Sequence, residues 1–346
     1  MSKYLAKLTP LEPYFFGNEK TFVFSNSDSD RYYIFSERMP MQTTILGMIR
    51  RLLIPAKVYD PSFIYSDTQR DIIGKWIGFK SFDIESQDTQ DFGHIQSISP
   101  VFLKKDEELL IPLPFDHRNE RDTVCYTPLK MGNCKMKTSF GEILLPEDFQ
   151  AKKGIADGFV SVSSNKIYKA EDIFKEVERV GIKKHGRKGK DEKGFFKREY
   201  KMLDGDFSFA FYFELKDGTE IKDSIVYLGQ KKSPFELSIC QTEQSDIRFN
   251  AQGGQRVYLL SDSYCKEDVY DCCDFCITGT RDFRNLAVTN DSRQGYYRKL
   301  TKAKYKINLL KAGSVFYVKD MGCFKRHMDN ENCRKIGFNK YLILGD

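Results

Sequence analysis

Residues 195–215 contain two strand-like runs on either side of the dipeptide Asp204-Gly205. Both runs are rich in aromatic residues, which favour the pleated surface of a β-strand. Asp-Gly is a frequent pair in the tight turn of a hairpin, because both positions of that turn need a positive φ. The pattern therefore predicts a long β-hairpin, and any fold proposed for the chain has to include an antiparallel sheet around it.

The other segments predict many short strands and few helices. A helix is expected after Pro40, because the apolar residues of 45–53 recur at the i, i+3, i+4 spacing of a helix face. Shorter helices are expected at 69–77 and 171–177, and a second hairpin at 101–111 around a charged turn. Strands and helices follow one another without regular alternation, which favours an α+β fold with mostly antiparallel sheets.

Positive charge is concentrated in one segment. The 346-residue chain has 55 Lys and Arg against 49 Asp and Glu, a net charge of +6. Residues 181–201 alone hold nine Lys or Arg against three Asp or Glu, which also gives +6. The glycine-rich first part of this segment is expected to be a loop, and the second part a strand that carries Phe195 and Phe196. Cations beside aromatic rings suit single-stranded nucleic acid, but an ordinary solvated loop explains the charge equally well.

The sequence lacks the common catalytic motifs. Its four histidines form no HExxH pair and adjoin no Gly-x-Ser-x-Gly sequence, and there is no Walker A sequence and no Gly-x-Gly-x-x-Gly after a strand. His185 has the chemistry of a general base for RNA cleavage. Within so basic a segment, a phosphate contact or solvent exposure is the favoured interpretation. We therefore expect a protein that is not an enzyme and uses no cofactor.

The nine cysteines are scattered, apart from one cluster. A structural zinc site needs four ligands, commonly from two Cys-x-x-Cys pairs, and only one such pair is present. Ordinary thiols are therefore the favoured interpretation. The chain opens with MSKYLAKLTP and has no uncharged apolar run of transmembrane length, so a cytoplasmic protein with reduced thiols and no membrane contact is expected. The weak candidates for zinc ligands are Cys265, Cys272, Cys273 and Cys276, and a site that draws on Cys323 or Cys333 downstream stays open as an alternative.

Five separated motifs, in order along the chain, resemble those of one protein family. That family is the third subunit of the type III-B CRISPR (Cmr) effector complex, within the RAMP superfamily. Gln230 departs from the family pattern, which usually has a second glycine there, and residues 129–166 and 261–300 match no motif. The similar stretches begin with MPMQTTILGMIR at 39–50 and continue at 99–116, 178–200 and 228–230, and the fifth motif combines 312–317 with 337–339.

The resemblance implies two ferredoxin-like (RRM-like) halves, 1–220 and 221–346, with long insertions that include a basic stretch at 181–198. It implies a non-catalytic subunit in antiviral defence that holds the 5′ repeat-derived handle of the crRNA. The implied partners are the large polymerase/cyclase subunit and the first backbone subunit, with target RNA contacted indirectly. The alternative is a metal-independent RAMP endoribonuclease that processes guide-RNA precursors, although residues 39–53 lack the histidine such an enzyme usually needs. A protein adaptor without RNA contact is a third interpretation.

Three parts of the sequence supply candidate RNA-binding residues. The N-terminus of the first helix offers backbone N–H groups that can receive a phosphate, and arginines follow on its polar face. The basic stretch can clamp the guide backbone, and an aromatic ring after it can stack on a base. A late Gly-Ser pair can let backbone amides approach RNA. Ordinary capping, solvated arginines and a plain turn are the competing interpretations. The candidates are Gln42, Thr43, Thr44, Arg50, Arg51, Arg179, Lys183, Lys184, His185, Arg187, Lys188, Lys190, Phe196, Arg198, Gly313 and Ser314.

Overall fold

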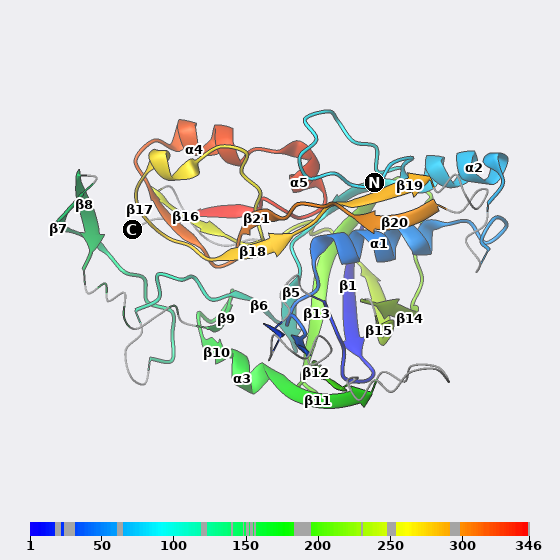
Figure 1. Ribbon diagram of the computed structural model, residues 1–346, viewed down its shortest axis with the longest axis horizontal. Helices are drawn as coiled ribbons and strands as arrows, with labels where there is room; N and C mark the ends of the chain where they lie inside the picture. The colour runs from blue at the N-terminus through cyan, green and yellow to red at the C-terminus, as the bar shows by residue number, and fades with distance from the viewer. Residues whose placement is uncertain are drawn as a thin grey trace.

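The computed structural model describes residues 1–17, 22–23, 32–60, 65–118, 123–139, 141–147, 149, 152, 155, 157–182, 195–229, 231–247, 254–290 and 298–344. Over these residues the protein is α+β: mostly antiparallel sheets form the fold and short helices lie against them (Figure 1). The predicted fold class is therefore confirmed. No helix in this part of the chain is long and apolar enough to cross a membrane.

The largest sheet is antiparallel throughout. Its strands, in spatial order, are β10 (Ile167–Lys169), β9 (Gly158–Ser161), β6 (Glu108–Pro112), β5 (Phe102–Lys105), β13 (Phe207–Leu215), β1 (Ser2–Pro10), β15 (Ser233–Gln241) and β14 (Ser224–Leu228), and β4 (Ile95–Ile98) also pairs with β13. β13 thus pairs with β1 along one edge and with both β5 and β4 along the other. The hairpin predicted at 101–111 is confirmed, because β5 and β6 pair directly.

Strand β13 is buried on both faces, which explains its unbroken apolar sequence FSFAFYFEL. Successive side chains of a strand point to opposite faces. Phe209 and Phe211 therefore face the core shared with helix α1 (Gln42–Leu53), whereas Ala210 and Tyr212 face the core shared with the C-terminal sheet. This strand therefore contributes to the cores on both sides of the large sheet.

Short helices cover the sheets. Helix α1 buries the apolar stripe that predicted it, and α2 begins at a capping box in which Ser66 and Gln69 satisfy each other's backbone N–H groups. The predictions of helices at 45–53 and 69–77 are confirmed. The other helices are α2 (Asp67–Ile77), α3 (Ala170–Ile173), the 3₁₀ helix η2 (Val269–Cys272), α4 (Met321–Met328) and α5 (Glu331–Lys335).

A second sheet forms a long ribbon at one end of the molecule (Figure 1). Its strands, in spatial order, are β11 (Phe174–Ile182), β12 (Phe195–Leu203), β3 (Tyr32–Phe35) and β2 (Phe22–Val23). β11 and β12 are antiparallel from Phe174↔Leu203 to Ile182↔Phe195, and β3 joins β12 in parallel. The helix predicted at 171–177 is correct only for its first turn, because the chain enters β11 at Phe174.

The hairpin predicted around Asp204-Gly205 is wrong, although both of its strands exist. The turn itself is present, and the Phe207 N–H donates to the Asp204 carbonyl at 3.0 Å. β12, however, pairs with β11 and β3, whereas β13 pairs with β1, β4 and β5. Both edges of each strand are occupied by other partners, so the turn passes the chain from the ribbon into the large sheet.

The C-terminal sheet lies across the upper part of Figure 1. Its strands, in spatial order, are β17 (Cys273–Ile277), β22 (Val315–Val318), β16 (Arg256–Leu259) and β23 (Tyr341–Leu344). One face packs on the α4 residues Phe324 and Met328, and the other shares a core with β13. Three two-stranded sheets complete the described part of the chain: β18 (Thr280–Phe283) with β21 (Ile307–Leu310), β19 (Leu286–Asn290) with β20 (Arg298–Lys302), and β7 (Met131–Thr138) with β8 (Gly141–Pro146).

The two main sheets share one strand order. Numbered along the chain, β1, β5, β13 and β15 lie in the order second-third-first-fourth, and so do β16, β17, β22 and β23. This order supports the prediction of two ferredoxin-like halves. β14 and β15 extend the sheet of β1, so we propose that the boundary between the halves falls between Gln241 and Arg256, later than the 220/221 boundary expected from the sequence.

Glu108 provides a test of how acid destabilises the fold. Its carboxylate accepts hydrogen bonds from the hydroxyls of Tyr168 at 2.6 Å, Ser164 at 2.7 Å and Ser161 at 3.0 Å, and these bonds lower its pKa from 4.5. A lowered pKa contributes stability that is present above the ordinary value and lost as pH falls through the folded-state value. We expect Glu108→Gln to lower the free energy of unfolding by about 1–2 kcal/mol at pH 7, and by progressively less below pH 4.5.

Urea denaturation of both proteins across this pH range measures the difference. The control is Glu107→Gln, because the Glu107 side chain is fully exposed and, among the described residues, is paired with Lys104; it should change stability far less than Glu108→Gln at every pH. A gap between Glu108→Gln and the unsubstituted protein that does not change with pH would contradict the assignment.

Candidate nucleic-acid interface

A pocket of about 510 Å³ lies along the polar face of α1, where the helix meets hairpin β19–β20. Figure 1 shows this hairpin beside α1. Apolar residues of the pocket come from α1 and its surroundings, and cations come from both elements. The apolar lining includes Met41, Leu46, Ile54, Phe82 and Phe283, and the cations are Arg50, Arg51, Arg281, Arg284 and Lys302. An apolar hollow with a cationic rim is suited to a nucleotide, because the base is buried while the phosphates meet the cations.

Arg50 is a largely buried cation of the α1 pocket. Burial lowers its pKa to about 10, and its guanidinium lies 5.7 Å from the ring centroid of Phe92. Its Nε has no hydrogen-bond partner within the described ranges. Arg51, one residue on, is exposed, and its Nη2 donates to the Tyr59 hydroxyl at 3.1 Å. Both arginines that the helix spacing put on the polar face therefore line the pocket.

The three candidate residues at the N-terminus of α1 make different contacts. Gln42 is buried, and its Nε2 donates to the carbonyls of Ser99 and Gly337, both at 3.0 Å. This side chain therefore ties the helix to two distant loops. The Thr44 N–H donates to Met41 at 2.8 Å, as ordinary capping does. Of the three, only Thr43 lines the α1 pocket.

Gln42 thus joins three of the stretches that resemble one sequence family, namely 39–50, 99–116 and 337–339. The profile of the family described as CRISPR-associated protein (Cas_Cmr3) matches residues 6–345. The chain belongs to this family. The resemblance drawn from the five motifs is therefore confirmed.

Solved structures agree with the Cas_Cmr3 assignment at the level of the fold. A chain in a cryo-EM structure of the type III-B Cmr-beta complex bound to cognate target RNA is 14% identical, with a TM-score of 0.52, 98% of this chain and 96% of that chain being covered. A chain in the same complex bound to cognate target RNA and AMPPnP is 15% identical, with a TM-score of 0.50 and the same coverage. Among curated proteins, none matches the chain.

The Gly313-Ser314 pair, part of the fifth Cas_Cmr3-like motif, forms a packed turn. Gly313 has φ +98°, and a Cβ there would lie 2.5 Å from the ring of Phe115. Its carbonyl accepts from the Phe115 N–H at 2.8 Å. The buried Ser314 hydroxyl donates to the Lys311 carbonyl at 2.6 Å and accepts from the Gly279 N–H at 3.2 Å. These contacts favour the interpretation as a turn before a strand over an RNA contact.

The basic stretch of this Cas_Cmr3 protein is carried by the β11–β12 ribbon. Arg179 is exposed on β11, 4.6 Å from the ring centroid of Tyr200, and it is the register partner of Arg198 on β12. Phe196 pairs with Gly181 in the ribbon, and its side chain lies outside the described part of the structure. The remaining candidates lie outside the described residues: Lys183, Lys184, His185, Arg187, Lys188 and Lys190.

Sequence reasoning missed the far wall of the α1 pocket. Arg281, Arg284 and Lys302 come from 261–300 and its border, the region without a matching motif. Arg281 is also buried in an ion-pair cluster, with Asp262 at 2.8 Å and Glu37 at 3.7 Å. Arg281 and Arg284 are apparent in the sequence as part of an arginine-rich region, but no periodic pattern predicts that they lie beside α1.

The predicted zinc ligands are not brought together. The Sγ of Cys273 lies 3.5 Å from the Val269 carbonyl, and the Sγ of Cys265 lies 3.0 Å from the Met328 sulfur. Burial raises the pKa of Cys265 and of Cys273 to about 12 and that of Cys276 to about 11. Cys272 forms a disulfide with Cys323, so the expectation that all thiols are reduced does not hold in this structure.

Proposed function

We propose that this Cas_Cmr3 protein is the non-catalytic RNA-binding subunit of a type III CRISPR effector complex, where it holds the 5′ handle of the crRNA. In this role it bridges the large polymerase/cyclase subunit and the first backbone subunit, and it meets target RNA only indirectly. The family match over residues 6–345 carries the proposal. The likeness of fold to a chain of an RNA-bound Cmr complex supports it.

The charge distribution suggests two RNA contacts. The α1 pocket offers an apolar hollow lined by Arg50, Arg51 and Lys302, which suits one nucleotide of the handle. The basic stretch at 181–198 supplies cations for the adjoining phosphates. Thr43, at the start of α1, lines the same hollow and can donate to a phosphate through its hydroxyl.

Binding of handle-bearing guide RNA across a salt series tests the proposal. The purified chain, alone and with its large-subunit partner, should prefer the handle to a scrambled sequence. The logarithm of its affinity should fall with the logarithm of salt at about −0.7 per phosphate contacted. Equal affinity for the scrambled RNA in both settings would favour the protein adaptor. Specific cleavage of repeat RNA that is lost in His185→Ala would favour the endoribonuclease.

Gly47 allows the α1 pocket to be filled without disturbing the core. It is exposed in the middle of α1, lines the pocket, and has open space where a Cβ would stand. We expect the tryptophan side chain of Gly47→Trp to occupy the hollow. It should weaken binding of handle RNA by about tenfold, the affinity lost with roughly one stacked base. Fluorescence anisotropy with labelled handle RNA measures the effect.

The matched control is Gly47→Ala, which adds one methyl group and leaves the α1 pocket open. It should bind RNA as the unsubstituted chain does, while stabilising the helix by about 0.5–1 kcal/mol. If Gly47→Trp and Gly47→Ala bind the handle equally well, the pocket is not an RNA contact.

A further inference from the structure

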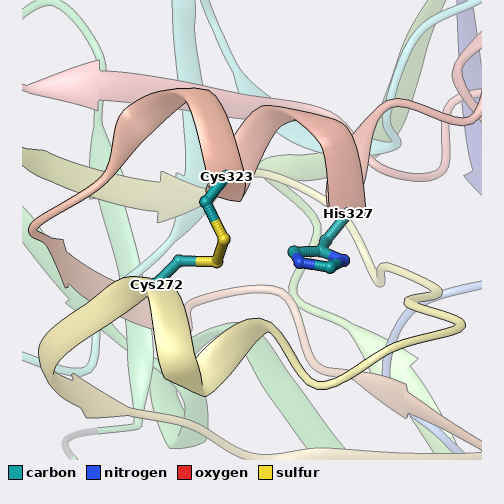
Figure 2. A group of neighbouring side chains, drawn as sticks. All are labelled: Cys272, Cys323 and His327. Atoms are coloured by element: carbon teal, nitrogen blue, oxygen red, sulfur yellow. A yellow bond between two sulfur atoms is a disulfide. The ribbon is translucent and has the colours of Figure 1, made fainter.

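The C-terminal half contains a group of metal-ligating side chains that RNA binding does not use. Cys323 and His327 are four residues apart on α4 and therefore lie on the same side of the helix. Cys272 approaches them from the end of η2 (Figure 2). One ligand atom of each residue lies within 4.8 Å of the other two. In the structure Cys272 and Cys323 form a disulfide, and the His327 ring lies beside it.

We propose that, when this disulfide is reduced, Cys272, Cys323 and His327 bind one Zn²⁺ ion. Two thiolates and an imidazole are a ligand set that zinc favours over harder divalent ions. Ligand atoms on one tetrahedral zinc lie about 3.5–3.8 Å from one another, given bond lengths of roughly 2.0–2.3 Å. Three ligand atoms that already lie within 4.8 Å of one another can meet this requirement through side-chain adjustment alone.

The surroundings of His327 match those of a zinc-bound histidine. Its Nδ1 lies 3.3 Å from a carboxylate oxygen of Glu267. Histidines that bind zinc commonly donate their second N–H to such a carboxylate, which fixes the tautomer. With Nδ1–H directed to Glu267, the lone pair of Nε2 remains for the metal. Glu267 and His327, though neither cysteine, also line a polar pocket of about 400 Å³, so an ion and a water ligand can approach from the histidine side of the site.

The neighbouring thiols do not compete for the ion. Cys265 and Cys273 are directed to other partners, the Met328 sulfur and the Val269 carbonyl. Cys272 and Cys323 are among the cysteines considered as zinc ligands from the sequence, whereas His327 is not. The bound ion would join η2 to α4, as the disulfide does in the oxidised chain. The two states exclude each other, because sulfur atoms bonded to one another are not thiolates.

The test uses the full-length chain and metal alone. A water-soluble trialkylphosphine reduces the disulfide: it takes up oxygen from water as the phosphine oxide, while the two sulfurs gain two electrons and two protons. Co²⁺ is then titrated in the absence of air, and Zn²⁺ is added to displace it. We expect one Co²⁺ per chain with thiolate-to-cobalt absorption in the near ultraviolet, release of the thiol protons, and displacement by Zn²⁺.

Variants assign the ligands. Cys323→Ser and His327→Ala should each weaken Co²⁺ binding by at least about tenfold, and Glu267→Gln by about tenfold through loss of the bond to His327. The control Cys276→Ser removes a neighbouring thiol and should titrate as the reduced parent chain does. Circular dichroism of every variant separates loss of the ligand from loss of the fold.

Glu267 keeps the test decisive even if a ligand variant does not fold, because its side chain is 71% exposed and outside the core. The proposal is overturned if the reduced chain shows no thiolate-to-cobalt band. It is also overturned if folded Cys323→Ser titrates like the parent chain, or if Glu267→Gln binds with unchanged affinity while Cys323→Ser fails to fold.

Discussion

Replacing five cations of the basic stretch with serine is expected to weaken binding of handle-bearing guide RNA on the order of a hundredfold at moderate salt. Each cation that neutralises a phosphate releases counterions, so removing five contacts should also flatten the log–log salt slope by about 3.5. Affinity measured at several salt concentrations gives both values. The substituted residues are Lys183, Lys184, Arg187, Lys188 and Lys190.

A matched control removes the same charge elsewhere. The control residues are exposed lysines away from α1 and the β11–β12 ribbon: Lys137, Lys216, Lys222, Lys231 and Lys325. Their replacement by serine lowers the net charge of the chain equally. It should change the log–log salt slope by less than about 0.7, the value for one phosphate contact. Equal losses in the two variants would mean that net charge alone attracts the RNA, and the clamp would be rejected.

Arg281→Met is expected to lower the free energy of unfolding by about 3–5 kcal/mol. The Arg281 side chain is only 15% exposed and lies between Asp262 at 2.8 Å and Glu37 at 3.7 Å. Asp262 is itself 10% exposed and also accepts a hydrogen bond from the Ala312 N–H at 3.0 Å. Methionine preserves much of the volume but leaves a buried carboxylate without its cation. Urea denaturation monitored by tyrosine fluorescence measures the loss.

Two further variants define the cause of this loss. Arg281→Lys keeps the charge but not the planar fork, and should recover part of the stability. Arg334→Met breaks an exposed pair with Asp329, 3.1 Å long and nearly half exposed at both ends, and should cost less than about 1 kcal/mol. An effect of Arg281→Met as small as that of Arg334→Met would show that the cluster is not effectively buried.

Local patterns in the sequence predicted element types better than strand partners. The apolar stripe of 45–53 was sufficient for α1, because a helix makes its hydrogen bonds within itself. The dipeptide Asp204-Gly205 correctly marked a turn, yet the strands around it pair elsewhere. Turn chemistry states only that the chain can reverse. Which strands become neighbours depends on competition from distant segments, here β1 and β11, that no local pattern reveals.

Only the α1 side of the α1 pocket could be predicted from the sequence. Helical spacing placed Arg50 and Arg51 together on the polar face of α1, and both line the α1 pocket. Arg284 and Lys302 reach the same pocket through the packing of the C-terminal half against α1, which sequence spacing does not encode. Gln42 was expected near RNA, but its amide joins Ser99 and Gly337 inside the protein. A polar residue at a helix start has the same sequence signature whether its partner is a ligand or a distant carbonyl.

Strand pairing in the β11–β12 ribbon does not depend on the length of the basic stretch. Register in the ribbon is set by paired residues from Phe174↔Leu203 to Ile182↔Phe195, which flank residues 183–194 in the sequence. Lengthening a connection between ends that are already held together costs only about 0.6 kcal/mol per doubling. Relatives of this protein can therefore gain or lose cations at this tip with little consequence for the rest of the molecule. If the proposed RNA clamp is correct, exchanging residues 183–194 between relatives should change the preference for the guide without unfolding the ribbon.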